Sequence, residues 1–350
     1  MTEKKSKNLP ELLVFLRLDN PKASILILSL WSLCLLSTFA VILGFGVRQK
    51  LTLVNRLDER DRLHFIAEAG IKKAISQIKK EPEKDYAALK DDWSNNTGVF
   101  KDIDIGDGKF SISRDYINEH IGLTESWYGL IDEESKININ KANQTILERL
   151  FRLVDFDETQ AQELAAAIVD WRDSDSELSI PLGSAEDSYY RNLEYSYEAK
   201  DADFEVLEEI LLVKGMDRNI FEKIKNYITI YGSGKINVNT ASKVVLLALG
   251  LSQDLVDKIV SFRLGEDGII GTSDDNVFDT PSNIVPKLSL FFHLSDSEIA
   301  QLSVIVDQYL VTNSNNFMAR CISKLNGKKK TTEVICVINR SGKILYWQES

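Results

Sequence analysis

The chain has 350 residues and a formal net charge of −11 at pH 7, because 53 Asp and Glu residues outnumber 42 Lys and Arg residues. A surface this acidic argues against binding to the phosphates of nucleic acids. Three cysteines are too few for a disulfide scaffold, whereas the length allows two domains with cores of their own.

A stretch without any charged residue runs from Ser24 to Val47 near the N-terminus. At about 1.5 Å rise per residue, a helix of this length crosses the roughly 30 Å hydrocarbon layer of a membrane. Directly afterwards, and without a proline, apolar residues take helical spacing at Leu63, Ile66, Ala67, Gly70, Ile71, Ala74, Ile75 and Ile78. We therefore expect one continuous helix whose first half spans a membrane and whose second half packs on a folded domain.

The residues before this span are few and basic, including Lys4, Lys5, Lys7, Arg17 and Lys22. By the positive-inside tendency, residues 1–23 are expected to stay in the cytoplasm and the bulk of the chain to lie on the far side, although Arg48 and Lys50 reduce the asymmetry. No small-residue cleavage site of a secretory signal peptide follows Val47, so we expect the span to be retained.

The basic leader, a small residue and a helix that is first apolar and then amphipathic resemble the N-terminal signal of type IV pilins and type II secretion pseudopilins. In those proteins a prepilin peptidase cuts before the apolar stretch, normally after Gly. The resemblance implies cleavage between Ala23 and Ser24, with Ala23 in place of the Gly. Hydropathy alone leaves an ordinary single-span anchor as the alternative.

Leu28 is the fifth residue after this junction, where most pilins carry a Glu that pairs with the N-terminal amine of the neighbouring subunit. A bare carboxylate at that depth would cost several kcal/mol. An apolar residue there suits a subunit with nothing above it, at the tip of a fibre. The phrases Asp61-Arg62, Ala67-Glu68-Ala69-Gly70-Ile71 and Ala74-Ile75 resemble one branch in particular, the minor pseudopilin K of the type II secretion machine.

Alternating apolar residues predict strands on both sides of the middle of the chain. Residues 109–113 and 128–132 are expected to pair as a hairpin. After a predicted helix over 295–310, residues 318–325, 334–338 and 343–347 predict a three-stranded meander, with Asn326-Gly327 as a turn. We expect these strands to join the earlier ones in one small sheet.

The middle of the chain contains a repeat, because residues 136–142 (KININKA) recur at 235–241 (KINVNTA) with five of seven positions identical. Each copy is followed by two predicted helices, and a third helical hairpin, over 204–227, lies between the copies. The predicted fold class is therefore α+β: a pilin-like long N-terminal helix on a small antiparallel sheet, with a large helical insertion of helix-hairpin-helix or SAM-like units. The predicted parts are the leader 1–23, the span 24–47, the pilin-like parts 48–135 and 312–350, and the insertion 136–311.

Helix-hairpin-helix units often bind DNA through turns with two glycines, whose backbone N–H groups meet phosphate. The turns here, over 154–157, 213–217 and 249–252, have one glycine or none, and the first two contain Asp. We expect packing units and no nucleic acid as a partner. A membrane-anchored protein that binds DNA during uptake is the alternative function.

The insertion after the first repeat carries the phrases most similar to pseudopilin K, over 171–175 and 183–190. Four carboxylates there, Asp173, Asp175, Glu186 and Asp187, are expected to converge on Ca²⁺, which takes 6–8 oxygen ligands. The spacing is not that of an EF-hand. Asp267, Asp274 and Asp275 form a second, weaker candidate site. The alternative at both places is a solvated acidic loop.

Two of the cysteines, Cys321 and Cys336, fall in the predicted C-terminal strands. They either pair as a disulfide in an oxidising compartment or remain buried free thiols on neighbouring strands. His64, His120 and His293 are scattered, and the sequence contains no nucleophile elbow, zinc-spaced pair or phosphate loop, so we do not expect an enzyme.

The resemblance implies a non-enzymatic minor pseudopilin at the tip of the type II secretion pseudopilus, which supports protein export across the outer membrane. It implies minor pseudopilins I and J, other pseudopilus subunits and the prepilin peptidase as partners. The expected location is the inner membrane, with a single pass and the bulk of the chain in the periplasm.

Overall fold

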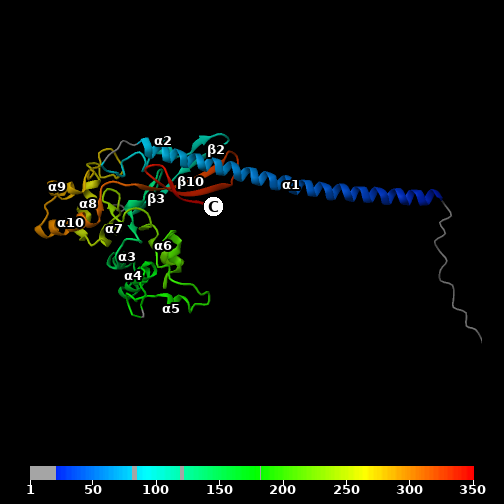
Figure 1. Ribbon diagram of the computed structural model, residues 1–350. Coiled ribbons are helices and arrows are strands. Elements are labelled where there is room, and N and C mark those ends of the chain that lie inside the picture. The colour runs from blue at the N-terminus through cyan, green and yellow to red at the C-terminus, as the bar shows by residue number, and fades with distance from the viewer. Residues whose placement is uncertain (1–20, 81–84, 119–121, 182) are drawn as a thin grey trace, which may run out of the picture. The chain divides into compact units, whose positions relative to one another are not determined.

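The computed structural model describes residues 21–80, 85–118, 122–181 and 183–350 (Figure 1). The chain divides into two compact units, Met1–Asp61 and Arg62–Ser350, and each is described here by itself. Helix α1 (Pro21–Lys80) contributes to both units. The predicted α+β class is confirmed, with a long N-terminal helix, an antiparallel sheet and a separate helical region.

In the first unit, α1 exposes almost all of its apolar side chains between Ile25 and Val47. This helix is long and apolar enough to cross a membrane, and none of its most apolar window is buried. The hydroxyls of Ser29, Ser37 and Thr38 donate to backbone carbonyls of the preceding turn. Their hydrogen-bonding needs are therefore met inside the helix, as a lipid environment requires.

In the second unit, the remaining part of α1 buries the predicted apolar stripe against the sheet. Leu63, Ala67 and Ala74 have no exposed surface, and Ile66, Ile71 and Ile78 are also buried. At Gly70 an added Cβ would lie 2.5 Å from the Sγ atom of Cys321. The glycine therefore allows the helix backbone to approach the sheet closely.

The main sheet has six strands, in the order β1-β2-β10-β11-β12, with β5 also paired to β10. The strands are β1 (Ile103–Ile105), β2 (Gly108–Ile112), β5 (Ile131–Asp132), β10 (Asn316–Leu325), β11 (Thr331–Asn339) and β12 (Ile344–Glu349). All pairs are antiparallel. The predicted C-terminal meander is confirmed, and so is its union with strands that precede the helical region.

The predicted hairpin between residues 109–113 and 128–132 is wrong. Strands β2 and β5 do not pair with each other; they lie one after the other along β10. The hairpins are local: β1 pairs with β2, and β3 (Arg114–Asn118) pairs with β4 (Leu123–Trp127). The turn between β1 and β2 contains Gly106 at φ 56°, a conformation that glycine adopts without strain.

The helical region has its own hydrophobic core, separate from the core between α1 and the sheet. Its first part contains η1 (Glu133–Ser135), β6 (Ile137–Asn138), α3 (Gln144–Leu153), α4 (Glu158–Arg172), α5 (Asp187–Tyr190), η2 (Leu207–Leu212), α6 (Arg218–Ile224) and β7 (Ile228–Thr229). Its second part contains β8 (Ile236–Asn237), α7 (Lys243–Ala248), α8 (Gln253–Arg263), η3 (Pro281–Asn283), α9 (Ile284–Phe291), α10 (Asp296–Tyr309) and β9 (Leu310–Val311). A short helix, α2 (Thr97–Phe100), precedes the sheet.

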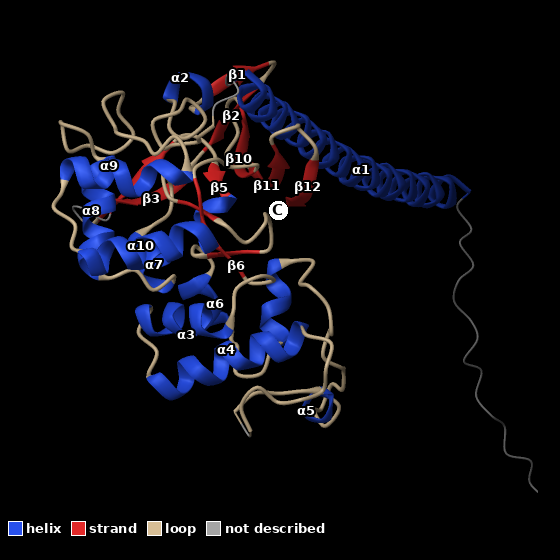
Figure 2. Cartoon of the chain, turned by 60° about the vertical axis from the view of Figure 1, so that its left-hand side comes forward, coloured by secondary structure: helices blue, strands red, loops and turns tan. Residues whose placement is uncertain are grey.

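These helices form two groups, with α3, α4 and α6 in one and α7 to α10 in the other (Figure 2). The groups meet where α3 packs against α7. The helix predicted over 295–310 is confirmed as α10, which Ser295 caps through a hydrogen bond from the backbone N–H of Glu298.

The repeated phrase builds the same local structure twice. In each copy the first Asn accepts a hydrogen bond from the backbone N–H of the second, Asn138 from Asn140 and Asn237 from Asn239. The second Asn of each copy then holds one distant phenylalanine by its backbone. Asn140 accepts from Phe204 N and donates to Phe204 O, and Asn239 does the same with Phe278.

Each copy is closed by an arginine at the end of its second helix. Arg172 of α4 donates to the carbonyl of Ala142, and Arg263 of α8 donates to the carbonyl of Ala241. The short strand of each copy pairs in parallel, β6 with β7 and β8 with β9. The equal spacing of these residues in the two copies therefore has a structural cause. In each copy they anchor a strand, a loop and two helices to one another.

Candidate metal centre

The candidate site lies where α4 ends and the chain loops back to α5. Asp173 follows the last residue of α4, and Glu186 occupies the N-cap position of α5. Asp170, fully buried in the last turn of α4, accepts hydrogen bonds from Ser179 N with both carboxylate oxygens, each at 3.2 Å. This pair of bonds holds the loop against the end of the helix. Sequence reasoning did not single out Asp170, although an acidic residue inside an otherwise apolar helical phrase was a signal.

Three of the four predicted ligands come together. One carboxylate oxygen each from Asp173, Asp175 and Glu186 lies within 4.8 Å of the other two. Glu186 is only 5% exposed, Asp173 is half-buried and Asp175 is exposed. Asp173 Oδ1 and Glu186 Oε1 are buried, and neither has a hydrogen-bond partner among the described residues. Two such oxygens are costly unless something else satisfies them.

The pKa values of these carboxylates also indicate that the group lacks a neutralising positive charge. Burial raises the pKa of Glu186 to about 7, and the charges of Asp170 and Asp173 add to this effect. Burial also raises the pKa of Asp173, with a further contribution from Asp175. Arg172, at the end of α4, directs a hydrogen bond to the carbonyl of Ala142. The carboxylates therefore repel one another unless a proton or a cation lies between them.

The donor set fits a hard divalent cation. All three ligands are carboxylates, and Ca²⁺ prefers oxygen ligands and tolerates irregular loops. Asp175 lies on the exposed side of the group, which leaves a path for an ion and its waters. The unsatisfied oxygens of Asp173 and Glu186 are the observation in this structure that distinguishes the group from an ordinary acidic surface loop.

The fourth predicted ligand, Asp187, does not join this group. Its Oδ1 atom accepts from the backbone N–H of Ala199 at 2.9 Å, and its Oδ2 atom accepts from Arg191 at 2.7 Å. The physical reason is the start of α5 at Asp187, because consecutive side chains on a helix diverge by about 100°. Asp187 holds the returning chain at Ala199 instead.

The second predicted cluster uses its carboxylates to fold its own loop. Asp274 accepts from the backbone N–H groups of Glu266 and Asp267 at 2.9 and 3.0 Å and from the Thr272 hydroxyl. These bonds, the Thr272 contact above all, lower the pKa of Asp274 to about 2. Asp275 accepts from Gly271 N, and Asp267 accepts from Ile269 N. Each of the three carboxylates thus accepts at least one backbone N–H, and the structure does not bring these three side chains together as a ligand set.

The other residues singled out in the sequence lie apart from this site. In the structure Cys321 and Cys336 are buried free thiols on the neighbouring strands β10 and β11, which is the free-thiol alternative. Their strands pair in a register that places Cys321 opposite Val334 and Cys336 opposite Ala319, so the two cysteines are not directly opposite each other.

The predicted N-terminal residues lie in α1. Ala23 and Ser24 belong to its first turns, and Leu28 is 69% exposed. Of the three histidines, His64 contacts Glu349 at 2.7 Å, His293 is exposed, and His120 lies outside the described residues.

A buried polar junction that the sequence did not reveal ties the helical region to the sheet. Asp132, at the end of β5, accepts from the side chains of Asn237, Thr240 and Ser314. Nearby, Glu134 accepts from the backbone and the side chain of Asn316 at 3.0 and 2.8 Å. Burial raises the pKa of Glu134 to about 8, and the charge of Asp132 adds to the shift. The run Asp132-Glu133-Glu134 directly after an apolar strand was the available signal.

Comparisons with known proteins agree with this architecture. Residues 128–233 match the family described as type II secretion system protein K. The type II secretion system protein K of Aeromonas hydrophila is 23% identical over 285 residues, which cover 80% of this chain and 80% of that protein. A crystal structure of the GspK–GspI–GspJ complex from the type 2 secretion system of enterotoxigenic Escherichia coli contains a chain with a similar fold. That likeness has a TM-score of 0.61 at 17% identity and covers 85% of this chain and 99% of that chain. The resemblance to the minor pseudopilin K family is confirmed.

Proposed function

Because residues 128–233 match the type II secretion system protein K family and the similar fold extends beyond them on both sides, we propose that this chain is a non-enzymatic minor pseudopilin at the tip of the pseudopilus. In this role it supports protein export across the outer membrane. The observation that carries the proposal is the sheet itself, in which strands from before and after the helical region pair along β10 beneath α1.

The tip position rests on α1. Leu28 stands where most pilins have a glutamate, and its side chain is exposed on the apolar part of the helix. A subunit at the end of a fibre has no neighbour above it whose amine could neutralise a carboxylate at this depth, so an apolar side chain is the stable choice there.

The location follows from the same helix. The uncharged stretch is long enough for a single membrane pass, and its polar side chains bond within the helix. We place this pass in the inner membrane and the sheet and helical region in the periplasm. A prepilin peptidase removes the leader between Ala23 and Ser24 in this scheme.

The helical hairpins are better suited to packing than to DNA. Asp157 accepts from Gln160 N at the start of α4, and Asp217 accepts from Ile220 N at the start of α6. The N-termini of α4 and α6, where a phosphate would bind, are therefore each occupied by a carboxylate, which would repel the phosphate.

The carboxylates Asp173, Asp175 and Glu186 are proposed to bind Ca²⁺ as a structural ion. The ion supplies the positive charge that the group lacks, and it has no part in a chemical reaction. Its effect is to hold the loop after α4 against the start of α5, because its ligands come from both ends of that loop.

Partner binding tests the assignment. The crystal structure of the Escherichia coli GspK–GspI–GspJ complex joins three such proteins, and we extend this to pseudopilins I and J of the same organism as this chain. A soluble chain from Arg48 onward, mixed with the soluble parts of I and J, is expected to elute as one complex in size-exclusion chromatography. Loss of secretion in a strain that lacks this chain, with recovery on complementation, is expected as well. Independent elution of the three proteins together with normal secretion would overturn the proposal.

A further inference from the structure

Three cations follow the uncharged part of α1 without an intervening acid. Arg48, Lys50 and Arg56 are exposed, and the first acidic residue after the uncharged stretch is Asp58. Within the part of the chain that the structure describes, none of the three forms an ion pair. The positive-inside tendency favours cations on the cytoplasmic side of a span. It therefore does not account for these three cations, which follow the span on the side expected to face the periplasm.

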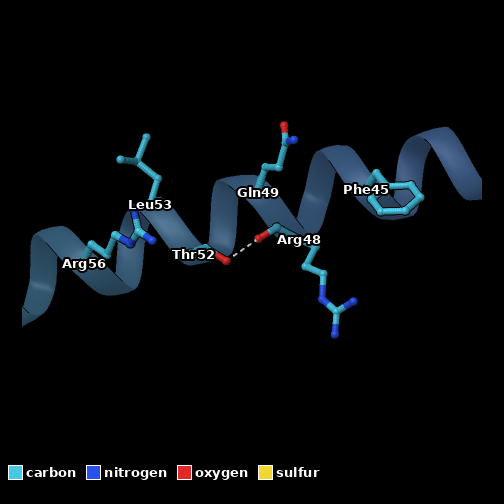
Figure 3. A pocket seen from close by; sticks show the side chains of 6 residues that line it. All are labelled: Phe45, Arg48, Gln49, Thr52, Leu53 and Arg56. Carbon is cyan, nitrogen blue, oxygen red and sulfur yellow. Dashed lines mark hydrogen bonds between the residues drawn. The ribbon is translucent and has the colours of Figure 1, made fainter. Parts of the chain in front are cut away.

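The two arginines line one shallow hollow on the helix surface, and Lys50 lies outside it. Figure 3 shows a shallow hollow that is lined by Phe45, Arg48, Gln49, Thr52, Leu53 and Arg56. The Thr52 hydroxyl donates to the carbonyl of Arg48 at 2.9 Å, so this polar group is satisfied inside the helix. The guanidinium groups and the amide of Gln49 are thus left as the free donors of the hollow, which Phe45 and Leu53 line with exposed apolar side chains. Such a mixture of apolar and cationic side chains suits the boundary between hydrocarbon and water.

The geometry of an α-helix directs these side chains toward the span. Every Cα–Cβ bond of a helix leans toward its N-terminus. Arg48, Lys50 and Arg56 therefore lean back toward Val47, where the uncharged stretch ends. Arg56 lies about 12 Å beyond Arg48 along the axis, a distance that a long side chain and a tilted helix reduce further.

We propose that Arg48, Lys50 and Arg56 bind the phosphate groups of anionic phospholipids at the membrane surface where the span ends. The guanidinium fork matches two phosphate oxygens, and Lys50 adds a point charge. An acidic partner protein would suit the charges equally, but it would not account for Phe45 and Leu53 beside them or for their position directly after the span. The proposal rests on the membrane pass proposed above, and it gives the helix a defined depth in the bilayer.

Lipid selectivity of the full chain tests this assignment. The chain is reconstituted in phosphatidylcholine vesicles that contain a trace of spin-labelled phosphatidylglycerol or spin-labelled phosphatidylcholine, and the motionally restricted fraction of each label is measured. We expect phosphatidylglycerol to be preferred about fivefold, the factor for one cation at an anionic surface, and the preference to fall as salt is added. In the variant Arg48→Gln/Lys50→Gln/Arg56→Gln this preference should fall, and only the part that the basic leader contributes in both chains should remain.

The matched control removes the same charge from the helical region, in Arg218→Gln/Lys223→Gln/Lys235→Gln, whose side chains are exposed. It should keep the preference of the parent chain. Equal restriction of both labels by the parent chain, or an unchanged preference in the first variant, would overturn the inference and leave the membrane pass standing. If neither label is restricted, the pass itself is absent and the inference falls with it.

Discussion

Asn239 brackets the backbone of Phe278, because its side chain accepts from Phe278 N at 2.8 Å and donates to Phe278 O at 2.9 Å. The two residues lie 39 positions apart, and Asn239 is only 3% exposed. A single side chain thus fixes the path of the loop that connects α8 to α9. Asn140 holds Phe204 in the same manner in the first repeat, but with more exposure to solvent.

We therefore expect Asn239→Ala to destabilise the protein by about 2 kcal/mol, because the backbone groups of Phe278 would be buried without these partners. Asn140→Ala should cost less, since water can reach that site. Urea unfolding of both variants measures the difference, with the exposed Asn192→Ala as the control. Equal losses in all three variants would contradict the role of the repeated Asn.

Calcium should stabilise the helical region. An ion that binds only the folded chain adds about 2.7 kcal/mol at a hundredfold excess over its dissociation constant. A soluble chain from Arg48 onward should melt at a higher temperature in millimolar Ca²⁺ than in chelator, and Mg²⁺ should replace Ca²⁺ poorly because it demands a tighter octahedral shell.

The variant Asp173→Asn/Asp175→Asn should lose this calcium response. The control Glu177→Gln/Glu194→Gln removes the same charge from exposed positions nearby and should keep the response. Coincident melting curves of the parent chain with and without Ca²⁺ would mean that the group is an acidic surface only.

The stability of the calcium-free chain should fall as pH rises through the titration of Glu186. Its pKa is raised to about 7 in the folded state, whereas the ordinary value of Glu is near 4.3. Between these two pKa values Glu186 is protonated in the folded state but ionised in the unfolded state. Its contribution to the free energy of unfolding is therefore complete below about pH 4 and is lost as pH approaches 7. Calcium affinity should rise over the same window, because the proton competes with the ion.

Glu134 also has a raised pKa, so the pH dependence is measured as a difference between the parent chain and Glu186→Gln. Urea unfolding in chelator should show a smaller decline with pH in this variant. A decline as steep as that of the parent would show that Glu186 does not titrate in this range.

Leu28→Glu should impair secretion if the chain occupies the tip. The new carboxylate would lie in hydrocarbon without an amine to neutralise it, at a cost of several kcal/mol. Secretion of a reporter and the amount of chain in the membrane fraction are the readouts, and Leu28→Ile serves as the control that keeps the position apolar. Normal secretion with normal membrane content would remove the argument for the tip.

Local periodicity allowed the helix and the C-terminal meander to be predicted. The stripe from Leu63 to Ile78 and the turn at Asn326-Gly327 are signals contained in short windows of sequence. The pairing of β2 was mispredicted because alternation alone does not say which strands meet. Its neighbours in the sheet are β1, directly before it, and β10, about two hundred positions away.

The group of carboxylates was predicted in part for a similar reason. Spacing indicated Glu186 and Asp187 equally, and only the start of α5 between them separates their directions. Asp132 could not be placed at the junction from sequence, because its three side-chain donors come from segments more than a hundred positions further along the chain.

The pairing of β10 with β2 and β5 determines when the sheet can close. Residues 316–325 follow the whole helical region, so α1 has no complete surface to cover until nearly all of the chain has been synthesised. The helical region has a core of its own and can condense earlier. Contacts between distant segments form slowly, because the chain between their ends must first be brought together. Until the sheet closes, the apolar stripe of α1 is therefore left uncovered, and a chaperone that holds this stripe would act before this late step of folding.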